Sequence, residues 1–274
     1  METQIVPPVL PFFAYGFLKP GEVAHFRIKP YVRTARPCSV RGDLFVRDGL
    51  LIADRSGNSR VDGVLLEFDP GQDELARQAI FDLEPSQQYF WDTIQVDGKQ
   101  ANILWGRKPK KGSVPLDFDW SSWDDPLFTS ALEVVDQQIQ AHSSWDRSYK
   151  NTFHLQMAYL LLWTSIERYA SLRYHLKRDA TKKVELVAKE PAFGDQLRNL
   201  VVEVRSVQRA DEPDTKVELK PHNPSDAMSY YYQVRSNMVH RGKGMPRDHG
   251  TVLMCCRELL LIFRHVLSVA RAEA

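Results

Sequence analysis

The chain has 274 residues, a length that suits one large domain or two of average size. Hydrophobic residues make up 43% and charged residues 26% of the sequence, which is the composition of a globular chain and argues against a disordered one. The 36 basic and 35 acidic side chains nearly cancel, so the chain has no overall positive field, and any nucleic-acid site must be local.

The cysteines and the first residues of the chain indicate in which cellular compartment the protein is expected. Cys38, Cys255 and Cys256 are too few for a disulfide framework and two are adjacent, so we expect free thiols in a reducing compartment. The opening METQIVPPVLPFF lacks a basic n-region and is broken by prolines, unlike a signal peptide. The most apolar run, residues 157–163, is far shorter than the roughly 20 residues that span a membrane. We expect a cytoplasmic protein without a membrane segment.

Short β-rich runs bounded by turn residues fill the first part of the chain. They cover residues 12–15, 42–46, 50–53, 61–68, 89–96 and 101–106. One helix is predicted over residues 71–84, with its apolar residues at helical spacing: Leu75, Ala79, Ile80 and Leu83. The next segment mixes proline, glycine and charge without periodicity, as linkers do. We therefore predict an α+β domain over residues 1–108 and a linker over residues 109–125.

From residue 126 to residue 274 helical periods replace the strand pattern, which predicts an all-α bundle. A long helix over residues 152–178 carries one apolar stripe, Leu155, Tyr159, Leu162, Ile166 and Tyr169. The charged segment 205–224 contains three prolines and is predicted to be a loop. Ser225 is the expected N-cap of a helix that runs to His240, and a final helix follows Pro246.

The helix from Ser225 has more than one functional face. On a helical wheel Arg235 and His240 lie about 140° apart, on opposite flanks of the core stripe. Met228, Tyr232 and Val239 form a second apolar strip that a single core contact does not cover. A second copy of the helix packed against it would cover the strip and bring both flanks into one cleft, so we expect a homodimer.

Arg235, the spacer SNMV and His240 form a pattern that resembles the ribonuclease motif of the HEPN superfamily. The resemblance covers much of residues 148–271, including LLWTSIE and VRSNMVHRGK, and is to the Apea-like type. Family members often have Asn, Asp or His directly after the arginine, where this chain has Ser236. The resemblance implies a helical bundle that cleaves RNA without a metal or another cofactor, in a stress or defence system.

The implied chemistry needs a group that titrates near neutrality and a fixed cation beside the phosphate. His240 suits proton transfer, and the guanidinium of Arg235 suits stabilisation of the charge that develops on phosphate oxygens. Alternatively, the two residues are ordinary cations near a helix C-terminus, where such charges are favourable.

Four further residues have supporting roles under this resemblance. Asn237 is placed to orient the imidazole or the ribose, and Arg241 and Lys243 to hold flanking phosphates. Glu167 matches an acidic position of the family, although an ordinary salt bridge explains it equally well.

The N-terminal segment FAYGFLKPGE resembles the YG-x-L-x-x-G loop of the γ-glutamylcyclotransferase-like fold. CSVRGDLF, VDGVLLEF and FDLEPSQQY follow in the family's order, so the resemblance covers residues 11–106 and implies a small β-barrel with helices. Carried over by position, the implied ligand-binding residues are Tyr15, Gly16, Phe17, Leu18, Gly21 and Tyr89.

Glu84 is the acid/base that this second resemblance implies, moving a proton during formation of 5-oxoproline. Phe17, Pro85, Gln87 and Gln88 depart from the residues usual in the family. Alternatively, Glu84 is an exposed residue at a helix end and the loop is a tight turn.

Three functions therefore stay open. The first is an endoribonuclease whose N-terminal domain binds a small γ-glutamyl-type ligand or a partner. In the second, the N-terminal domain is a cyclotransferase and the helical domain a dimerising scaffold. In the third, both domains are binding modules.

Overall fold

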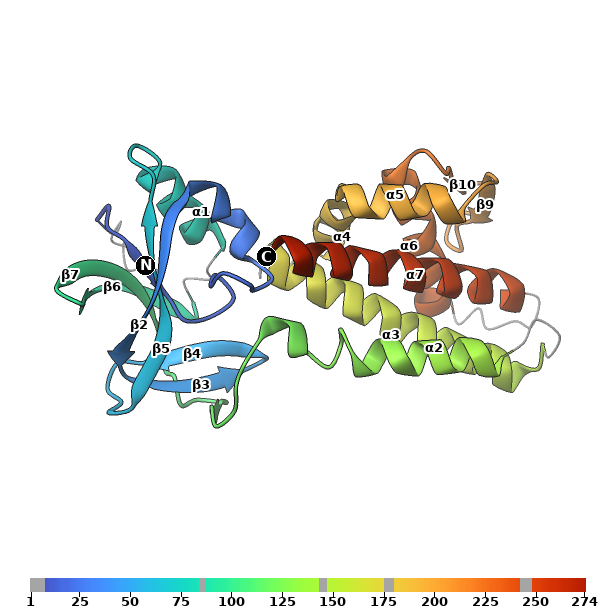
Figure 1. The fold of residues 1–274 in the computed structure, drawn as a ribbon. Coiled ribbons are helices and arrows are strands. Elements are labelled where there is room, and N and C mark those ends of the chain that lie inside the picture. Colours follow the sequence, from blue (N-terminus) through green and yellow to red (C-terminus); the bar gives the residue numbers. More distant parts are fainter. Residues whose placement is uncertain (1–7, 84–86, 143–146, 175–179, 242–247) are drawn as a thin grey trace. The chain divides into compact units, whose positions relative to one another are not determined.

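A computed structural model of the chain describes residues 8–83, 87–142, 147–174, 180–241 and 248–274 (Figure 1). The chain forms two compact units. Unit one comprises residues 1–125, 172–177 and 271–274, and unit two comprises residues 126–171 and 178–270. The protein is thus a mixed α and β structure, with most strands in unit one and most helical residues in unit two.

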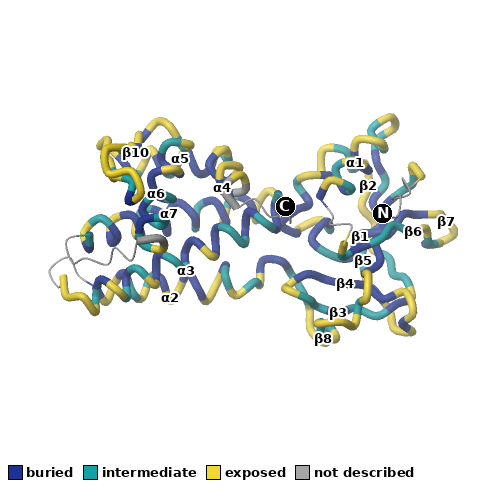
Figure 2. The backbone as a smooth tube through the Cα atoms, turned by 180° about the vertical axis from the view of Figure 1, so that it is seen from behind, coloured by how far each residue is buried: buried dark blue, intermediate teal, exposed yellow. Residues whose placement is uncertain are grey.

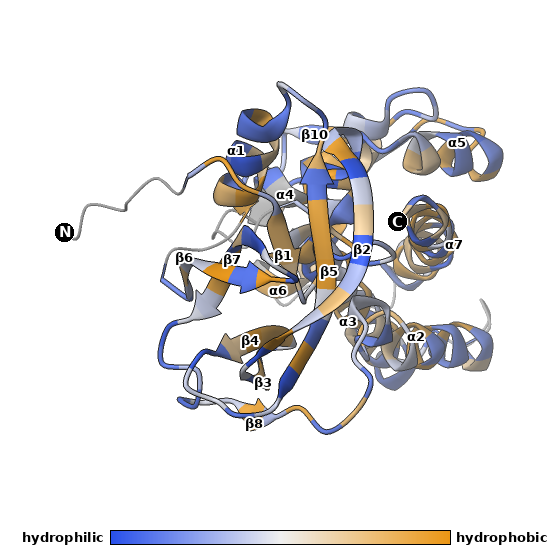
Figure 3. Ribbon diagram, turned by 60° about the vertical axis from the view of Figure 1, so that its left-hand side comes forward, coloured by the Kyte–Doolittle hydropathy of each residue, from blue (hydrophilic) through white to orange (hydrophobic). Residues whose placement is uncertain are grey.

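Unit one is built on two β-sheets. The larger has the order β2-β5-β1-β7-β6, formed by β2 (Val32–Arg41), β5 (Arg60–Phe68), β1 (Phe12–Ala14), β7 (Lys99–Gly106) and β6 (Tyr89–Val96). In the smaller sheet β3 (Asp43–Arg47) pairs with both β4 (Leu50–Asp54) and β8 (Val114–Pro115). β1 is parallel to β7, and the other pairings are antiparallel. Figure 3 shows how apolar residues concentrate along β5.

Close packing explains one glycine of the larger sheet. A Cβ at Gly63 in β5 would lie 2.6 Å from the carbonyl oxygen of Ala14 and 2.6 Å from the ring of Phe13. Phe13 is fully buried in a core cluster with Leu65, Ile103 and other apolar residues of both sheets. Only glycine lets β5 approach β1 this closely.

The six predicted strands are all present, but the helix of unit one differs from the prediction. α1 spans Asp73–Leu83 and buries Ala76, Arg77, Ile80 and Leu83. Leu75, which was placed on the apolar stripe, is 53% exposed. Arg77 takes a place on the buried face because its guanidinium is neutralised by an ion pair with Glu74.

The segment that was predicted as a linker packs within unit one. β8 pairs with β3, and a 3-10 helix, Ser122–Asp124, buries Trp123, whose Nε1 donates a hydrogen bond to the Gly21 carbonyl at 2.8 Å. The buried carboxylate of Glu22 accepts hydrogen bonds from the backbone and the hydroxyl of Ser122. Parts of residues 109–125 are therefore held in unit one by a strand pairing and by buried contacts at Ser122 and Trp123, which their polar composition did not predict.

Unit two is mainly helical. Its elements are α2 (Ser130–Ala141), α3 (Tyr149–Arg173), α4 (Ala180–Ala188), α5 (Pro191–Leu200), α6 (Pro224–Arg241) and α7 (His249–Glu273), with the last residues of α3 and α7 assigned to unit one. Figure 2 shows the buried residues along α3 and α7. Fully buried aromatic side chains, among them Tyr159, Trp163 and Phe263, fill the core. No described helix is both long and apolar enough to cross a membrane.

The all-α prediction for this half is wrong, because the predicted loop contains an antiparallel hairpin. Its strands are β9 (Arg205–Gln208) and β10 (Lys216–Leu219). The inward-facing Arg205 pairs with Glu258 of α7 at 2.6 Å. A charged residue therefore occupies a strand position that is usually apolar, and the alternating pattern that identifies a strand is absent from the sequence. Pro213 lies in the turn and does not interrupt either strand.

Candidate functional site

α6 is the element that carries the predicted ribonuclease motif, and its start differs from the prediction. Pro224 is the first helical residue, and the Asn223 side chain accepts hydrogen bonds from the backbone of Ser225 and Asp226, both at 3.2 Å. The predicted N-cap, Ser225, therefore lies inside the helix, because Asn223 followed by proline is the stronger start signal.

Two buried tyrosines hold α6 in unit two. The Tyr159 hydroxyl of α3 donates to the Tyr231 carbonyl at 2.9 Å, and the Tyr231 hydroxyl donates to Glu258 of α7 at 2.9 Å. Burial raises the pKa of Tyr231, so it stays a neutral donor. These bonds, together with the pair between Arg205 and Glu258, join α3, α6, α7 and the hairpin into one network.

Arg235 lies where α6 meets α3, with a quarter of its side chain exposed. Its terminal nitrogen is 3.5 Å from a carboxylate oxygen of Glu167, and its guanidinium carbon is 5.4 Å from the Tyr232 ring centroid. The buried Nε of Arg235 has no hydrogen-bond acceptor among the described residues. The structure thus brings together two predicted site residues, Arg235 and Glu167. Their ion pair is a salt bridge of the kind given as the alternative role of Glu167. The pair is long and leaves donor capacity on the guanidinium.

The second apolar strip of α6 is smaller than predicted. Met228 is only 2% exposed, and the Tyr232 ring packs edge-on against Trp163 with centroids 5.4 Å apart. Val239 is 47% exposed. The chain's own core therefore covers Met228, and the uncovered surface of the strip is centred on Val239.

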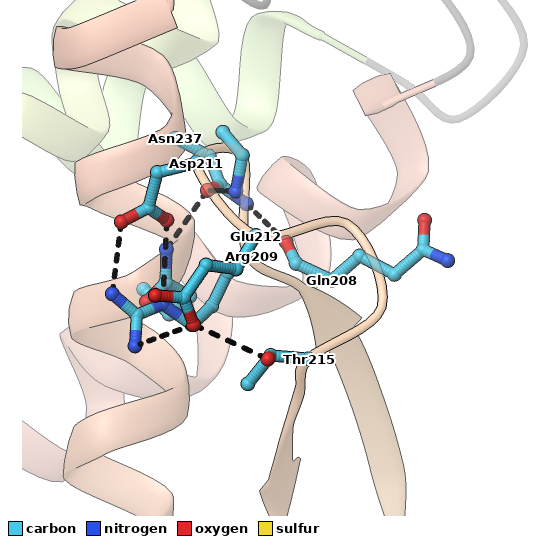
Figure 4. Close-up of polar contacts among 8 residues, drawn as sticks. Gln208, Arg209, Asp211, Glu212, Thr215 and Asn237 are labelled. Carbon is cyan, nitrogen blue, oxygen red and sulfur yellow. Dashed lines mark hydrogen bonds and ion pairs between the residues drawn. The ribbon is translucent and has the colours of Figure 1, made fainter.

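Asn237 is committed to the hairpin rather than free beside His240 (Figure 4). Its Oδ1 accepts from the Ala210 backbone at 2.9 Å and from the Gln233 side chain at 2.8 Å, and its Nδ2 donates to the Gln208 carbonyl at 2.9 Å. An amide oxygen has two lone pairs and an amide nitrogen two protons, so one proton is left uncommitted. The geometry makes Asn237 a clamp between α6 and the hairpin.

The other predicted residues of this helix are only partly described. His240 and Arg241 are the last residues of α6 by their backbone, and their side chains lie outside the described residues. Lys243 lies outside the described residues altogether. Sequence reasoning missed the Arg205–Glu258 pair, because the two residues are far apart in the chain and only the unrecognised hairpin brings them together.

In unit one, the predicted ligand loop is a tight turn. The Lys19 amide donates to the Gly16 carbonyl at 2.9 Å, and Gly21 has a φ of +87°, which favours glycine. The Tyr15 hydroxyl donates to the Leu104 carbonyl at 2.6 Å, and the Tyr89 hydroxyl to the Leu51 carbonyl at 2.8 Å. Both tyrosines are thus structural donors in the core.

Two cavities touch this loop. The one enclosed by Tyr15, Gly16, Phe17, Leu18 and Tyr89 has a volume of about 20 Å³, which is room for about one water molecule. A larger, open cavity of about 990 Å³ touches Tyr15 and Lys19 and continues along β3 and β8. Glu84, the predicted acid/base, lies outside the described residues.

The remaining reactive side chains are the thiols. Burial raises the pKa of both Cys255 and Cys256 to about 12, and all three cysteines are free. Within the described ranges, three or more His, Cys, Asp or Glu side chains are nowhere grouped so as to hold a metal ion.

Comparisons with known proteins add little. No family model and no curated protein matches the chain. The crystal structure of an uncharacterised protein from Pyrococcus horikoshii covers 49% of this chain and 99% of its own, at 17% sequence identity and a TM-score of 0.30. A similarity this low carries no argument for fold or function.

Proposed function

We propose that unit two is a metal-independent endoribonuclease in which Arg235 and His240 act on the scissile phosphate. The observation that supports this most is the state of Arg235: its side chain is 24% exposed, and its ion pair with Glu167 is long, at 3.5 Å from the terminal nitrogen to the carboxylate oxygen. An arginine in that state can bind an anion through its free donors.

The proposed reaction uses the ribose itself as the nucleophile. His240 takes the proton of the 2′-hydroxyl, and the 2′-oxygen attacks the phosphorus. The bond from phosphorus to the 5′-oxygen breaks as that oxygen takes the proton back from the imidazolium of His240. Arg235 stabilises the charge that accumulates on the phosphate oxygens. The products are a 2′,3′-cyclic phosphate and a 5′-hydroxyl.

The proposal includes a homodimer through α6. On a helical wheel, positions 235 and 240 of α6 lie about 140° apart, so a single copy of the helix carries them on different sides. Two copies related by a two-fold axis can place the Arg235 flank of one beside the His240 flank of the other. The exposed Val239 is the apolar residue of α6 that such a contact would cover.

For unit one we propose binding of a small γ-glutamyl-type ligand or a partner that modulates unit two. The open cavity that touches Tyr15 and Lys19 is large enough for such a ligand, whereas the 20 Å³ cavity under the loop is not.

Lys19→Ala should weaken binding of a γ-glutamyl amine in calorimetry, with Lys99→Ala, on β7 and outside that cavity, as the control. Equal affinity of both variants would remove this assignment.

The test of the proposed function is cleavage of transfer and ribosomal RNA by the full chain in EDTA. Arg235→Ala and His240→Ala should each lower the rate by about 100-fold or more. Matched controls are Arg198→Ala on α5 and His222→Ala before α6, both at exposed positions of unit two. Cutting that appears only with added divalent metal, or that survives unchanged in both site variants, would show that the proposal is wrong.

A further inference from the structure

A cavity of about 460 Å³ lies in unit two between the hairpin, α6 and the first turn of α7. Its walls include Ser206, Gln208 and Lys216 from the hairpin, Val234 and Met238 from α6, and Asp248 before α7. All of these residues belong to unit two, so the cavity does not depend on how the units are placed. The volume is in the range of sites that enclose one small molecule.

The hairpin wall of this cavity is fixed rather than free to close. Asn237 holds the Gln208 carbonyl and the Ala210 amide at 2.9 Å each (Figure 4). One terminal nitrogen of Arg205 donates to both carboxylate oxygens of Glu258, at 2.8 and 2.6 Å. A preformed cavity of this kind binds a ligand without first ordering a loop.

The lining suits an unpaired nucleotide. Buried Val234 and half-buried Met238 give an apolar surface against which a base can lie, and the exposed Ser206, Gln208 and Lys216 form a polar rim. Within the described residues, Lys216 has no ion pair and the Gln208 side chain no hydrogen bond. A free ammonium binds phosphate, and a free amide reads base edges.

The cavity lies beside the predicted catalytic histidine. Asn237 and Met238 line it, and His240 follows two residues later, about 60° around α6 from Asn237. Arg235 lies on the other side of the helix, toward Glu167. A base held here would leave its phosphate near the end of α6 that carries His240.

We propose that this cavity binds one unpaired nucleotide of the RNA substrate next to the cleaved bond, with Lys216 on a phosphate and Gln208 on the base edge. The inference rests on the proposed function for the word "cleaved", while binding itself does not require catalysis. The substrate class it implies is single-stranded RNA or a loop, because a paired base cannot enter a cavity without leaving its stack.

The test measures binding of a short labelled single-stranded oligoribonucleotide to the full chain by fluorescence anisotropy, in the His240→Ala background so that RNA stays intact. Lys216→Ala should weaken binding about tenfold and lower the slope of log K against log salt by about one. Gln208→Ala should change the preference among oligonucleotides of different base. Lys189→Ala, at an exposed position before α5, should match the parent.

The outcomes separate this inference from the proposed function. If the Lys216→Ala, Gln208→Ala and Lys189→Ala variants bind the oligonucleotide equally well, the cavity does not bind a nucleotide. Equal affinity of the protein for the single strand and for a duplex of the same sequence would have the same meaning. Loss of binding in Lys216→Ala together with unchanged cutting in Arg235→Ala and His240→Ala would keep the cavity and reject the proposed catalytic pair. Circular dichroism spectra of each variant check that the fold is retained.

Discussion

Asn237 shows how a residue next to a predicted catalytic group can be structural. Its amide satisfies the backbone of Gln208, the last residue of β9, and of Ala210, two residues beyond it. The polar type and the spacing from His240 were visible in the sequence, but the partners were not, because they lie 27 and 29 residues away in a hairpin that the sequence did not predict.

Asn237→Ala should therefore destabilise unit two. The change leaves a backbone donor and a backbone acceptor without partners, at about 1–3 kcal/mol for each group that stays buried. Chemical denaturation of the full chain measures the loss, and Asn199→Ala, at an exposed position of α5, is the control. A loss no larger than that of the control would contradict the clamp.

The buried thiols make a prediction about alkaline pH. The folded-state pKa of Cys255 and of Cys256 is raised from 9.0 to about 12, so the folded chain keeps both protons where the unfolded chain releases them. Stability is fully present below pH 9.0 and falls as the pH rises toward 12, by up to about 1.4 kcal/mol per thiol and pH unit.

Denaturation midpoints measured from neutral pH upward should fall, and the fall should be shallower in the double variant Cys255→Ala/Cys256→Ala. Buried tyrosines contribute a decline in the same direction, so some pH dependence remains in the variant. Parallel profiles for the two proteins would contradict the assigned burial of the thiols.

At the scale of elements, α6 carries the proposed dimer contact. Val239 is exposed, so Val239→Glu places a charge on the contact without opening the core of the subunit. Tyr232→Glu is a less specific change, since Tyr232 also packs against Trp163 and Arg235.

Light scattering should report a dimer for the wild type and a monomer for Val239→Glu, with RNA cleavage lost in parallel. Val202→Glu, at a position that is 88% exposed outside α6, should stay dimeric and active. A wild type that is monomeric at working concentration, or a monomeric variant that cuts at the normal rate, would show that the site is not formed by two copies of α6.

The elements differ in how well the sequence predicted them. The strand runs of unit one were found because their apolar residues are concentrated and bounded by turns, as in Leu50–Asp54, where every residue is buried. β2 was missed as a strand because most of its residues are exposed and polar, and β9 because Arg205 faces inward. The sequence allowed a salt bridge at Glu167 but did not identify Arg235 as its partner, since that pairing depends on how α3 and α6 cross.

At the scale of the whole molecule, the chain divides into two units with separate cores, and the change from strand to helix patterns near residue 126 reflects that division. The segment 109–125 shows the limit of composition as a guide. Its prolines and charges predict a linker, yet Trp123 is only 5% exposed. The buried ring of Trp123 acts together with the pairing of β8 with β3 and the hydrogen bonds from Ser122 to Glu22 to hold this segment in unit one.

Trp123→Ala should loosen that segment. We expect faster trypsin cleavage at Lys108, Lys110 and Lys111 in the full chain, because the hydrogen bond to Gly21 and the buried ring no longer hold residues 121–124. Phe118→Ala, which removes a ring that is 56% exposed, is the control. Equal cleavage rates in the two variants would show that Trp123 does not hold the segment.

The activity proposed for this chain is cleavage of RNA through the ribose 2′-hydroxyl, with no metal needed. The measurement that tests it most directly is the chemistry of the ends produced from transfer RNA in EDTA, read by mass spectrometry. We predict 2′,3′-cyclic phosphate and 5′-hydroxyl ends that disappear in His240→Ala. Ends carrying a 5′-phosphate and a 3′-hydroxyl, which require attack by water, would contradict the account.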